Sequence, residues 1–431
     1  MLEISAPDLA SPTFKANPHP FYAHLRAESP VWRTKLPDKR TAWLVTRYED
    51  VLSVLGEDRF AKDPLNAQDP QQRAESPWVP GFLRPLEQNM LDLDDPDHRR
   101  LRTLVSRAFA PRLIGGLRRR VETICRELLD ETERKGGVEL VRDYALPLPA
   151  TVIAELLGVP AADHRKFHRW SNRLVSISSG RDLWRALPAA LASVRYLRKM
   201  SERRRVSSAD DLMSALVQAE EDGDKLDQDE LLAMSFLLLV AGHETTVNLI
   251  ASGTLALLEH PEQLEELRSD PLRVKPAVEE LLRYTSPVEI ATERYARQDL
   301  EVSGTEIPRG ELVLAVLGSA NRDEQHFDAP DDLDLWRDPQ QAPGLRARRH
   351  TPLPRSASGP DGGPDRHSDA STTPSEPPPR RRPRIATLEP WAVSTWLAKT
   401  TNKEMRNGEI TWYCNHPPVL PCVVIGLAHN M

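Results

Sequence analysis

An acid and an alcohol stand side by side inside the longest apolar stretch of this sequence. Residues 241–246 read Ala-Gly-His-Glu-Thr-Thr, within a mostly apolar run from 231 to 258. A carboxylate and hydroxyls in apolar surroundings cost free energy unless they have partners or a function. Glu244 beside Thr245 is a combination that can pass protons to a buried reaction site. These two residues are therefore the first candidates for a catalytic role.

Two small residues precede this pair. Ala241 and Gly242 remove side-chain bulk, so a flat group could lie against the backbone at this point. A purely structural interpretation is also open, in which the helix kinks at Gly242 and the hydroxyls bond back to the preceding turn. The motif by itself does not decide between the two.

A long helix must position the motif. Asp227 followed by Glu230 has the pattern of a capping box, and Pro261 interrupts the apolar run. Together they predict one helix over 228–259, with the acid and the alcohol near its middle.

A second set of polar residues lies earlier in the chain. His98 and Arg102 are four residues apart, so they share one helix face and could together hold a carboxylate. Arg99 and Arg100 lie beside them, which makes a solvated helix start the alternative interpretation.

Helical periodicity recurs up to residue 339. Besides the central helix, we expect helices at 18–28, 48–55, 97–109, 111–135, 148–157, 162–177, 184–204, 263–268 and 273–284. Short strands are expected at 43–46, 289–296, 300–302, 305–307 and 312–317. Residues 60–90 have no clear period, as in a lid or substrate loop. The expected fold is one large domain that is mainly α with a small β portion.

Composition and charge change at residue 340. The formal net charge is −7, yet residues 340–431 hold 12 Lys and Arg against 7 Asp and Glu. Residues 340–390 contain eleven prolines and nine arginines, a signature of disorder. We therefore divide the chain into a domain over 1–339, a disordered segment over 340–390 and an unrelated tail over 391–431. Residues 380–382 could be a basic binding motif, although biased sequence explains them more simply.

Cysteine usage and hydropathy bear on the compartment. Three cysteines in 431 residues indicate a reducing compartment without a disulfide framework. Charged residues and prolines interrupt the N-terminal region, so no signal peptide is expected. The apolar core at 231–242 is shorter than the roughly 20 residues that span a bilayer. We expect a cytoplasmic protein with no membrane anchor and no nucleic-acid partner.

Four segments together resemble the cytochrome P-450 family of haem-thiolate monooxygenases. Residues 241–246 resemble its central-helix signature, and Glu280-Leu-Leu-Arg283 resembles its helical Glu-x-x-Arg pair. Asp334-Leu-Trp-Arg337 is similar to the segment whose arginine joins that pair, and residues 95–102 are similar to the haem-edge helix of bacterial members. The segments follow the family order across residues 1–339.

The resemblance implies an activity and roles for the first candidates. An intact relative would bind haem and insert one atom of O2 into an organic substrate. Glu244 and Thr245 would deliver protons to the dioxygen, and Ala241 and Gly242 would give it room. His98 and Arg102, with the later Arg294, would bind the haem propionates.

Glu280 and Arg283 have the i,i+3 spacing of an ion pair. Alone they would be a surface pair worth roughly 0.2–0.5 kcal/mol. The resemblance instead implies a buried network with Arg337, in which bidentate geometry fixes how segments pack. We expect a structural role for all three.

The axial thiolate of the family is missing where the resemblance requires it. Such a thiolate pushes electron density onto the iron and favours O–O cleavage. Its loop would follow Arg337, but the chain has Pro352 near that place and cysteines only at 125, 414 and 422. Cys125 fits an amphipathic helix, and the other two lie in the tail. We expect no metal ligand among them.

A frameshift near residues 338–341 would explain this loss. Residues 341–346 can be encoded so that the next frame reads Lys-His-Leu-Ala-Phe-Gly. In the same frame, residues 353–360 can read Cys-Leu-Gly-Ala-Pro-Leu-Ala-Arg, which with the first segment forms a family-like ligand loop one residue too long. The alternative function is therefore a non-catalytic remnant without thiolate-bound haem.

Partners and substrate follow from the resemblance only in outline. A ferredoxin- or flavodoxin-type protein would relay electrons from NAD(P)H. Residues 60–90, helices near 165–200, and Val240, Val288 and Ile290 would line the pocket. The three named positions are apolar, so we expect a small hydrophobic substrate.

Overall fold

The computed structural model describes residues 7–9, 11–74, 89–109, 111–135, 138–175, 180–221 and 223–337. The Pro/Arg-rich segment and the tail predicted over 340–431 lie outside these residues. So do residues 75–88, which form part of the predicted lid.

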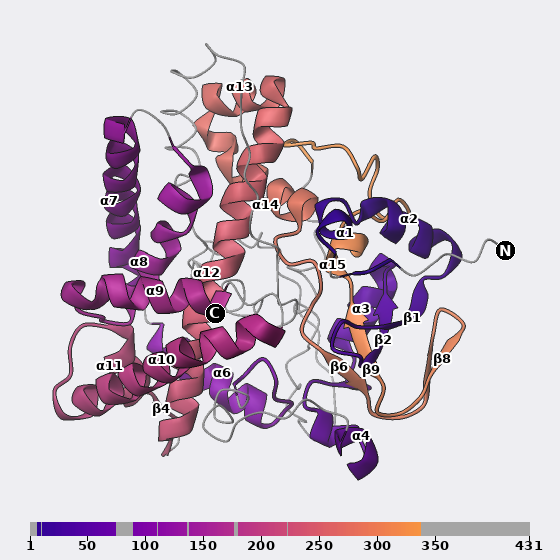
Figure 1. The fold of residues 1–431 in the computed structure, drawn as a ribbon, viewed down its shortest axis with the longest axis horizontal. Coiled ribbons are helices and arrows are strands. Elements are labelled where there is room, and N and C mark those ends of the chain that lie inside the picture. The colour runs from indigo at the N-terminus through magenta and orange to yellow at the C-terminus, as the bar shows by residue number, and fades with distance from the viewer. Residues whose placement is uncertain are drawn as a thin grey trace, which may run out of the picture.

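Helices make up most of the described chain (Figure 1). They are α1 (Pro12–Ala16), α2 (His19–Glu28), α3 (Tyr48–Gly56), α4 (Pro70–Ala74), α6 (Asp97–Ala108), α7 (Pro111–Lys135), α8 (Pro147–Leu156), α9 (His164–Val175), α10 (Gly180–Val206), α11 (Leu212–Gln218), α12 (Gln228–Glu259), α13 (Pro261–Ser269), α14 (Val274–Thr285) and α15 (Leu317–Ala320). The prediction of a mainly α fold with a small β portion is confirmed.

The β portion lies to one side of the helices, with α2, α3 and α15 around it (Figure 1). Its main sheet has the order β1 (Val31–Lys35), β2 (Thr41–Val45), β9 (Leu312–Ala315), β6 (Arg294–Ala296) and β3 (Phe60–Ala61). β2 and β9 run parallel, with Trp43 opposite Val313, and the other pairs are antiparallel. The two-stranded sheets are β4 (Glu220–Glu221) with β5 (Asp224–Lys225), and β7 (Leu300–Val302) with β8 (Thr305–Ile307).

α12 begins where the capping box predicts. The Asp227 carboxylate accepts hydrogen bonds from the backbone N–H groups of Asp229 and Glu230, and the Glu230 carboxylate accepts from the backbone N–H of Asp227. This arrangement satisfies N–H groups that a helix start would otherwise leave unpaired. The helix ends at Glu259, before Pro261.

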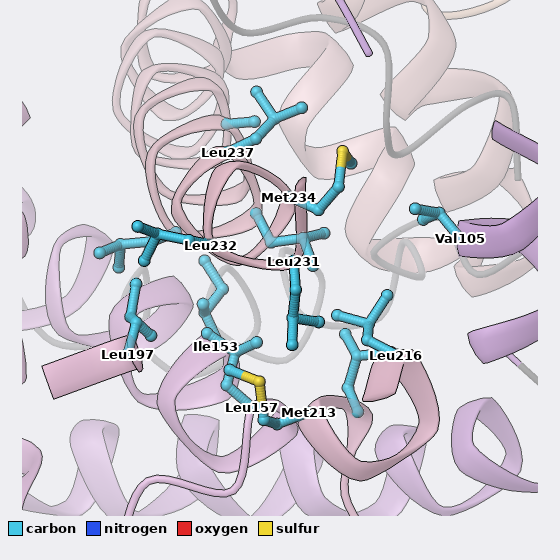
Figure 2. Packing of buried hydrophobic residues seen from close by; sticks show 14 of the residues in the cluster. Val105, Ile153, Leu157, Leu197, Met213, Leu216, Leu231, Leu232, Met234 and Leu237 are labelled. Carbon is cyan, nitrogen blue, oxygen red and sulfur yellow. The ribbon is translucent and has the colours of Figure 1, made fainter. Parts of the chain in front are cut away.

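Two apolar clusters share α12. The first joins its N-terminal half, up to Ala241, to α6, α8, α9, α10 and α11, and Figure 2 shows Ile153, Leu197 and Leu232 within it. The second joins its C-terminal half, from Val247 onward, to α7, α8 and α14. The polar motif at 242–246 therefore occupies the one turn of α12 between two hydrophobic contacts.

α12 is the one helix in the described ranges long and apolar enough to cross a membrane, with a mean hydropathy of 1.3 over 18 residues. Of that window, 56% is buried inside the protein. The helix has the predicted bounds and is 32 residues long, so its apolar window extends beyond the core at 231–242 that the sequence interpretation considered. Burial against neighbouring helices explains its hydropathy.

The sequence overestimated some strands and missed others. The expected strand at 289–296 is β-paired only from Arg294, since residues before it join the sheet edge by isolated bonds such as Ala291 N–H to Ala315 C=O. The expected strand at 312–317 ends at Ala315 because the chain turns into α15. The described part of the 60–90 segment includes β3 and α4, and the helices α1 and α11 and strand β1 were not predicted.

One glycine offers a test of the packing between α8 and α11. Gly158 has a φ of +80°, and a Cβ built there would lie 2.1 Å from Asp211 Oδ2. That carboxylate caps α11 by accepting from the backbone N–H of Ser214, and it pairs with Arg204 at 2.7 Å.

We therefore expect Gly158→Ala to lower the free energy of unfolding by about 1–3 kcal/mol, because it combines left-handed strain with a clash. Urea denaturation followed by circular dichroism measures the change. The matched control is Gly56→Ala, where no atom lies within 4 Å of the added Cβ. Equal effects of the two substitutions would contradict the packing argument.

Candidate functional site

The hydroxyls of the α12 motif bond back to the preceding turn. Thr245 Oγ1 donates to the Ala241 carbonyl at 3.0 Å, and Thr246 Oγ1 donates to the Gly242 carbonyl at 3.0 Å. The purely structural interpretation of the motif expects these bonds from the hydroxyls to the preceding turn. A hydroxyl that donates can still accept through its remaining lone pair, so the geometry leaves Thr245 able to take part in proton transfer.

Glu244 is partly buried and makes no hydrogen bond or ion pair with another described residue. Burial raises the pKa of its carboxyl from 4.5 to about 7, since no neighbouring cation stabilises the charged form. A carboxyl with a pKa near neutrality can both give and take a proton at physiological pH. The acid and the alcohol therefore have the properties that a proton relay requires.

The small residues of the motif have packing partners in this structure. A Cβ at Gly242 would lie 3.0 Å from Ile153 Cδ1 of α8. Ala241 is 3% exposed and belongs to the first apolar cluster. Helix packing thus accounts for the small side chains, and the room that they would give to dioxygen stays a prediction.

Arg294 is a buried cation without a carboxylate partner among the described residues. Its Nη1 donates to the carbonyls of Thr292 and Glu293 at 3.0 Å and to the Thr292 hydroxyl at 2.7 Å. Burial lowers the pKa of its guanidinium from 12.5 to about 10. A guanidinium in this state favours an anionic ligand, because a carboxylate would compensate its desolvation.

His98 lies in the first turn of α6, close to the same region. Its Nδ1 is 2.6 Å from the Met90 carbonyl and 3.2 Å from Lys62 Nζ. The backbone N–H of Lys62 donates to Asp94 at 2.8 Å, and the charge of Asp94 acts on Arg294. The structure thus brings His98 and Arg294 into one neighbourhood.

Arg102 lies one turn after His98 on α6. It is half-buried, and burial lowers the pKa of its guanidinium. His98, Arg102 and Arg294 are the residues that the family resemblance assigned to the haem propionates.

Two acids and a lysine near these cations were missed by the sequence interpretation. Lys62 contacts His98, Asp94 accepts from the Lys62 backbone, and Asp92 lies close enough for its charge to act on Arg294. Burial raises the pKa of Asp92 to about 6, although it accepts a hydrogen bond from Asn89. The acid-rich run at 92–97 was the only signal that could have indicated them.

Glu280, Arg283 and Arg337 form a buried network. Arg283 donates to both carboxylate oxygens of Glu280, at 2.8 and 2.7 Å, and both side chains are 2% exposed. Arg337 Nε lies 3.3 Å from Glu280 Oε1. Arg283 also donates to the carbonyls of Asn321, Pro330 and Asp332. The network joins α14 to the loop after α15.

The described residues hold no candidate for a thiolate ligand. Cys125 is fully buried in the second apolar cluster, and burial raises the pKa of its thiol, which favours the neutral form. No group of three or more His, Cys, Asp or Glu among residues 7–337, within the described ranges, could hold a metal ion. Cys414 and Cys422 lie outside the described residues.

The residues predicted to line a substrate pocket lie in or beside the core. Val240 is half-buried on α12. Ile290 is 8% exposed in a cluster with Leu44, and Val288 packs against the cluster that contains Val313. The helices predicted near 165–200 are α9 and α10.

Comparisons with known proteins agree with these observations. A family model described as Cytochrome P450 matches residues 180–341. The chain is 46% identical over 333 residues to Vitamin D(3) 25-hydroxylase of Pseudonocardia autotrophica, which covers 77% of this chain and 80% of the relative. It is 43% identical over 328 residues to Cytochrome P450 monooxygenase PikC of Streptomyces venezuelae, covering 75% and 76%.

Solved structures give the same result for the fold. The polyketide synthase cytochrome P450 PksS of Bacillus subtilis 168 superposes with a TM-score of 0.71 at 40% identity, over 77% of this chain and 83% of that chain. The myxobacterial cytochrome P450 CYP267B1 in complex with myristic acid also gives 0.71, at 42% identity, over 78% and 84%.

The raised pKa of Glu244 predicts a specific pH dependence of stability. The folded state binds the proton of the Glu244 carboxyl more tightly than the unfolded chain does. The contribution of this proton to the free energy of unfolding is therefore complete below pH 4.5 and is lost as the pH rises through 7. Replacing Glu244 by Gln should remove that loss, so the stability of the variant relative to the parent should grow by up to ~3 kcal/mol between pH 4.5 and 8.

Urea denaturation at a series of pH values measures this difference. The control is Glu301→Gln on β7, where the side chain is exposed and the change in the pH profile should be small. A Glu244→Gln difference that does not vary with pH would contradict the prediction.

Proposed function

We propose, because this chain belongs to the cytochrome P450 family, that residues 1–339 form a domain built for monooxygenation of a small apolar organic substrate. The relatives named above include a hydroxylase and a monooxygenase, so the family is one of oxidoreductases. One atom of O2 would enter the substrate, and NAD(P)H would supply electrons through a ferredoxin- or flavodoxin-type protein.

The observation that carries the proposal is the state of Glu244. An acid with a pKa near 7 stands beside Thr245, in the one turn of α12 between its two apolar contacts. A structural acid in such a place would be paired, as Glu280 is with Arg283. Glu244 has no partner among the described residues and is therefore available to take a proton from solvent and give it up inside the site.

The cations described above fit the propionates of haem. Arg294 is buried without a carboxylate partner among the described residues, and His98 and Arg102 lie one turn apart on α6, so we propose that these three hold the two acidic groups. Haem, when bound with a thiolate, supplies the activation of dioxygen. The described residues supply the cations and the proton relay of that site, but they do not supply the thiolate.

The second candidate function is a non-catalytic remnant, and the positions of the cysteines favour it for the chain as written. Cys125 is buried as a neutral thiol, far along the chain from the expected loop. The match to the family model ends at residue 341, next to the composition change that we attribute to a frameshift. We propose that the segment 340–390 and the tail 391–431 come from the shifted frame and form no part of the enzyme domain.

Relatives support an apolar substrate. One is named for hydroxylating vitamin D(3), and one structure holds myristic acid, and both are small hydrophobic molecules. The predicted pocket positions Val240, Val288 and Ile290 are likewise apolar. We propose a cytoplasmic location, no nucleic-acid partner and no membrane anchor, since the burial of α12 within the protein accounts for its hydropathy.

The decisive experiment is an absorption spectrum of the purified full chain after haem loading, reduction and addition of carbon monoxide. The chain as written should lack the Soret band of thiolate-ligated haem. A second chain, in which one nucleotide is removed or added near codons 338–341 to restore the family loop, should show it. A thiolate-type band from the chain as written would refute the loss of the ligand.

Haem titration tests the propionate site separately. Arg294→Gln should weaken haem binding roughly tenfold to a hundredfold, the cost of losing a hydrogen bond to a charged group. Arg33→Gln is the control, because Arg33 is 57% exposed and pairs with Glu311 at the edge of the sheet. Equal haem affinities for the parent and Arg294→Gln would contradict the assignment.

A further inference from the structure

His243 is a fully buried imidazole that the proton relay does not use. It is 0% exposed, and neither Nδ1 nor Nε2 has a hydrogen-bond partner among the described residues. Burial lowers the pKa of the ring to about 4, so the ring is neutral at physiological pH. It lies one turn after Leu239, which packs in the first apolar cluster.

The side chain faces α9. Phe167 and Leu174 of α9 belong to the same cluster as Leu239, so this face of α9 is turned to α12, and both helices cross in Figure 1. His168 lies on that face, and its charge acts on His243. His168 Nε2 is 3.3 Å from Thr151 Oγ1 of α8, and the ring is only partly buried.

Hydroxyls on α9 and α10 are also buried without partners among the described residues. Ser171, three residues after His168, is 1% exposed, and Ser193 of α10 is 2% exposed. Neither hydroxyl has a hydrogen-bond partner among the described residues. An unsatisfied buried polar group destabilises the fold, and a group without a protein partner is normally satisfied by ordered internal water.

We propose that His243 binds internal water between α9 and α12 and passes protons from His168 toward Glu244. The transfer of protons to Glu244 rests on the proposed role of Glu244 as the acid of the relay. The ligand at the site is water, and the hydroxyls of Ser171 and Ser193 are its further partners on α9 and α10.

The chemistry of a neutral imidazole suits this role. One ring nitrogen accepts a proton from a water on the His168 side. The other nitrogen gives its proton to a second internal water, which passes a proton on to the Glu244 carboxylate, so the ring is neutral before and after the transfer. Glu244 follows His243 in the chain, so its side chain projects from α12 about 100° further round the helix axis. A proton that arrives by this route reaches the acid from the α9 flank of α12.

Nuclear magnetic resonance of the full chain, labelled with 15N at histidine, tests the water site. His243→Gln assigns the resonance. The ring nitrogens of His243 should have the shifts of a hydrogen-bonded imidazole, and the ring N–H should give a cross-peak to water. Shifts of a free ring, or a bonded ring without a water cross-peak, would overturn the proposal on the unmodified protein.

Infrared spectroscopy tests the passage of protons. The carboxylic acid band of Glu244 at pH 6, assigned by its loss in Glu244→Gln, shifts when deuterium replaces the proton after mixing with D2O. We expect exchange at least tenfold slower in His243→Phe and in His243→Gln, because an amide can hold water but cannot relay a proton. The control is His24→Gln on α2, whose exposed side chain lies outside the packing of α9 and α12, so the rate should be unchanged.

The outcomes separate the two proposals. Unchanged exchange in both His243 variants overturns the relay and leaves the acid role of Glu244 intact. A parent protein without a carboxylic band from Glu244 overturns both the relay and that acid role, whereas the water cross-peak at His243 is measured independently of either.

Discussion

The burial of α12 between two apolar clusters is the constraint on which the rest of the structure depends. Ala241 is the last residue of the helix in one cluster, and Val247 is the first in the other. The turn between them contains every polar residue of the motif, whereas Ser235 and Thr254 are buried polar residues within the two apolar halves. The same burial that closes the core raises the pKa of Glu244 and lowers that of His243. Packing and chemistry therefore have one cause here.

Two buried arginines differ in how their charge is compensated. The charge of Arg283 is compensated by hydrogen bonds to both carboxylate oxygens of Glu280 and to three backbone carbonyls. Arg294 is also buried, but among the described residues its guanidinium donates only to Thr292 and to the Glu293 carbonyl. Because a buried ion pair is complete in itself, it orients segments; a buried cation without a carboxylate instead attracts an anion.

The sequence predicted what depends on local patterns. The capping box at Asp227 and Glu230 located the start of α12, and helical periodicity identified α6, α7, α10 and α14 within a few residues. Short strands were harder, since β1 and the start of β6 are defined by pairing with distant residues rather than by their own pattern. Lys62 and Asp92 escaped notice for the same reason: their proximity to His98 and Arg294 is a property of the fold.

The network around Arg283 has a consequence for how the sequence can vary. Its bonds tie residues 321–334 back to α14, and Arg337 adds bonds from its guanidinium to the Asp328 and Ala329 carbonyls. All of these partners lie before residue 338, so these bonds are made entirely within the upstream domain. None of these contacts involves a residue of the segment that we attribute to a frameshift. The shifted frame that we propose would therefore remove the ligand loop and leave these bonds in place.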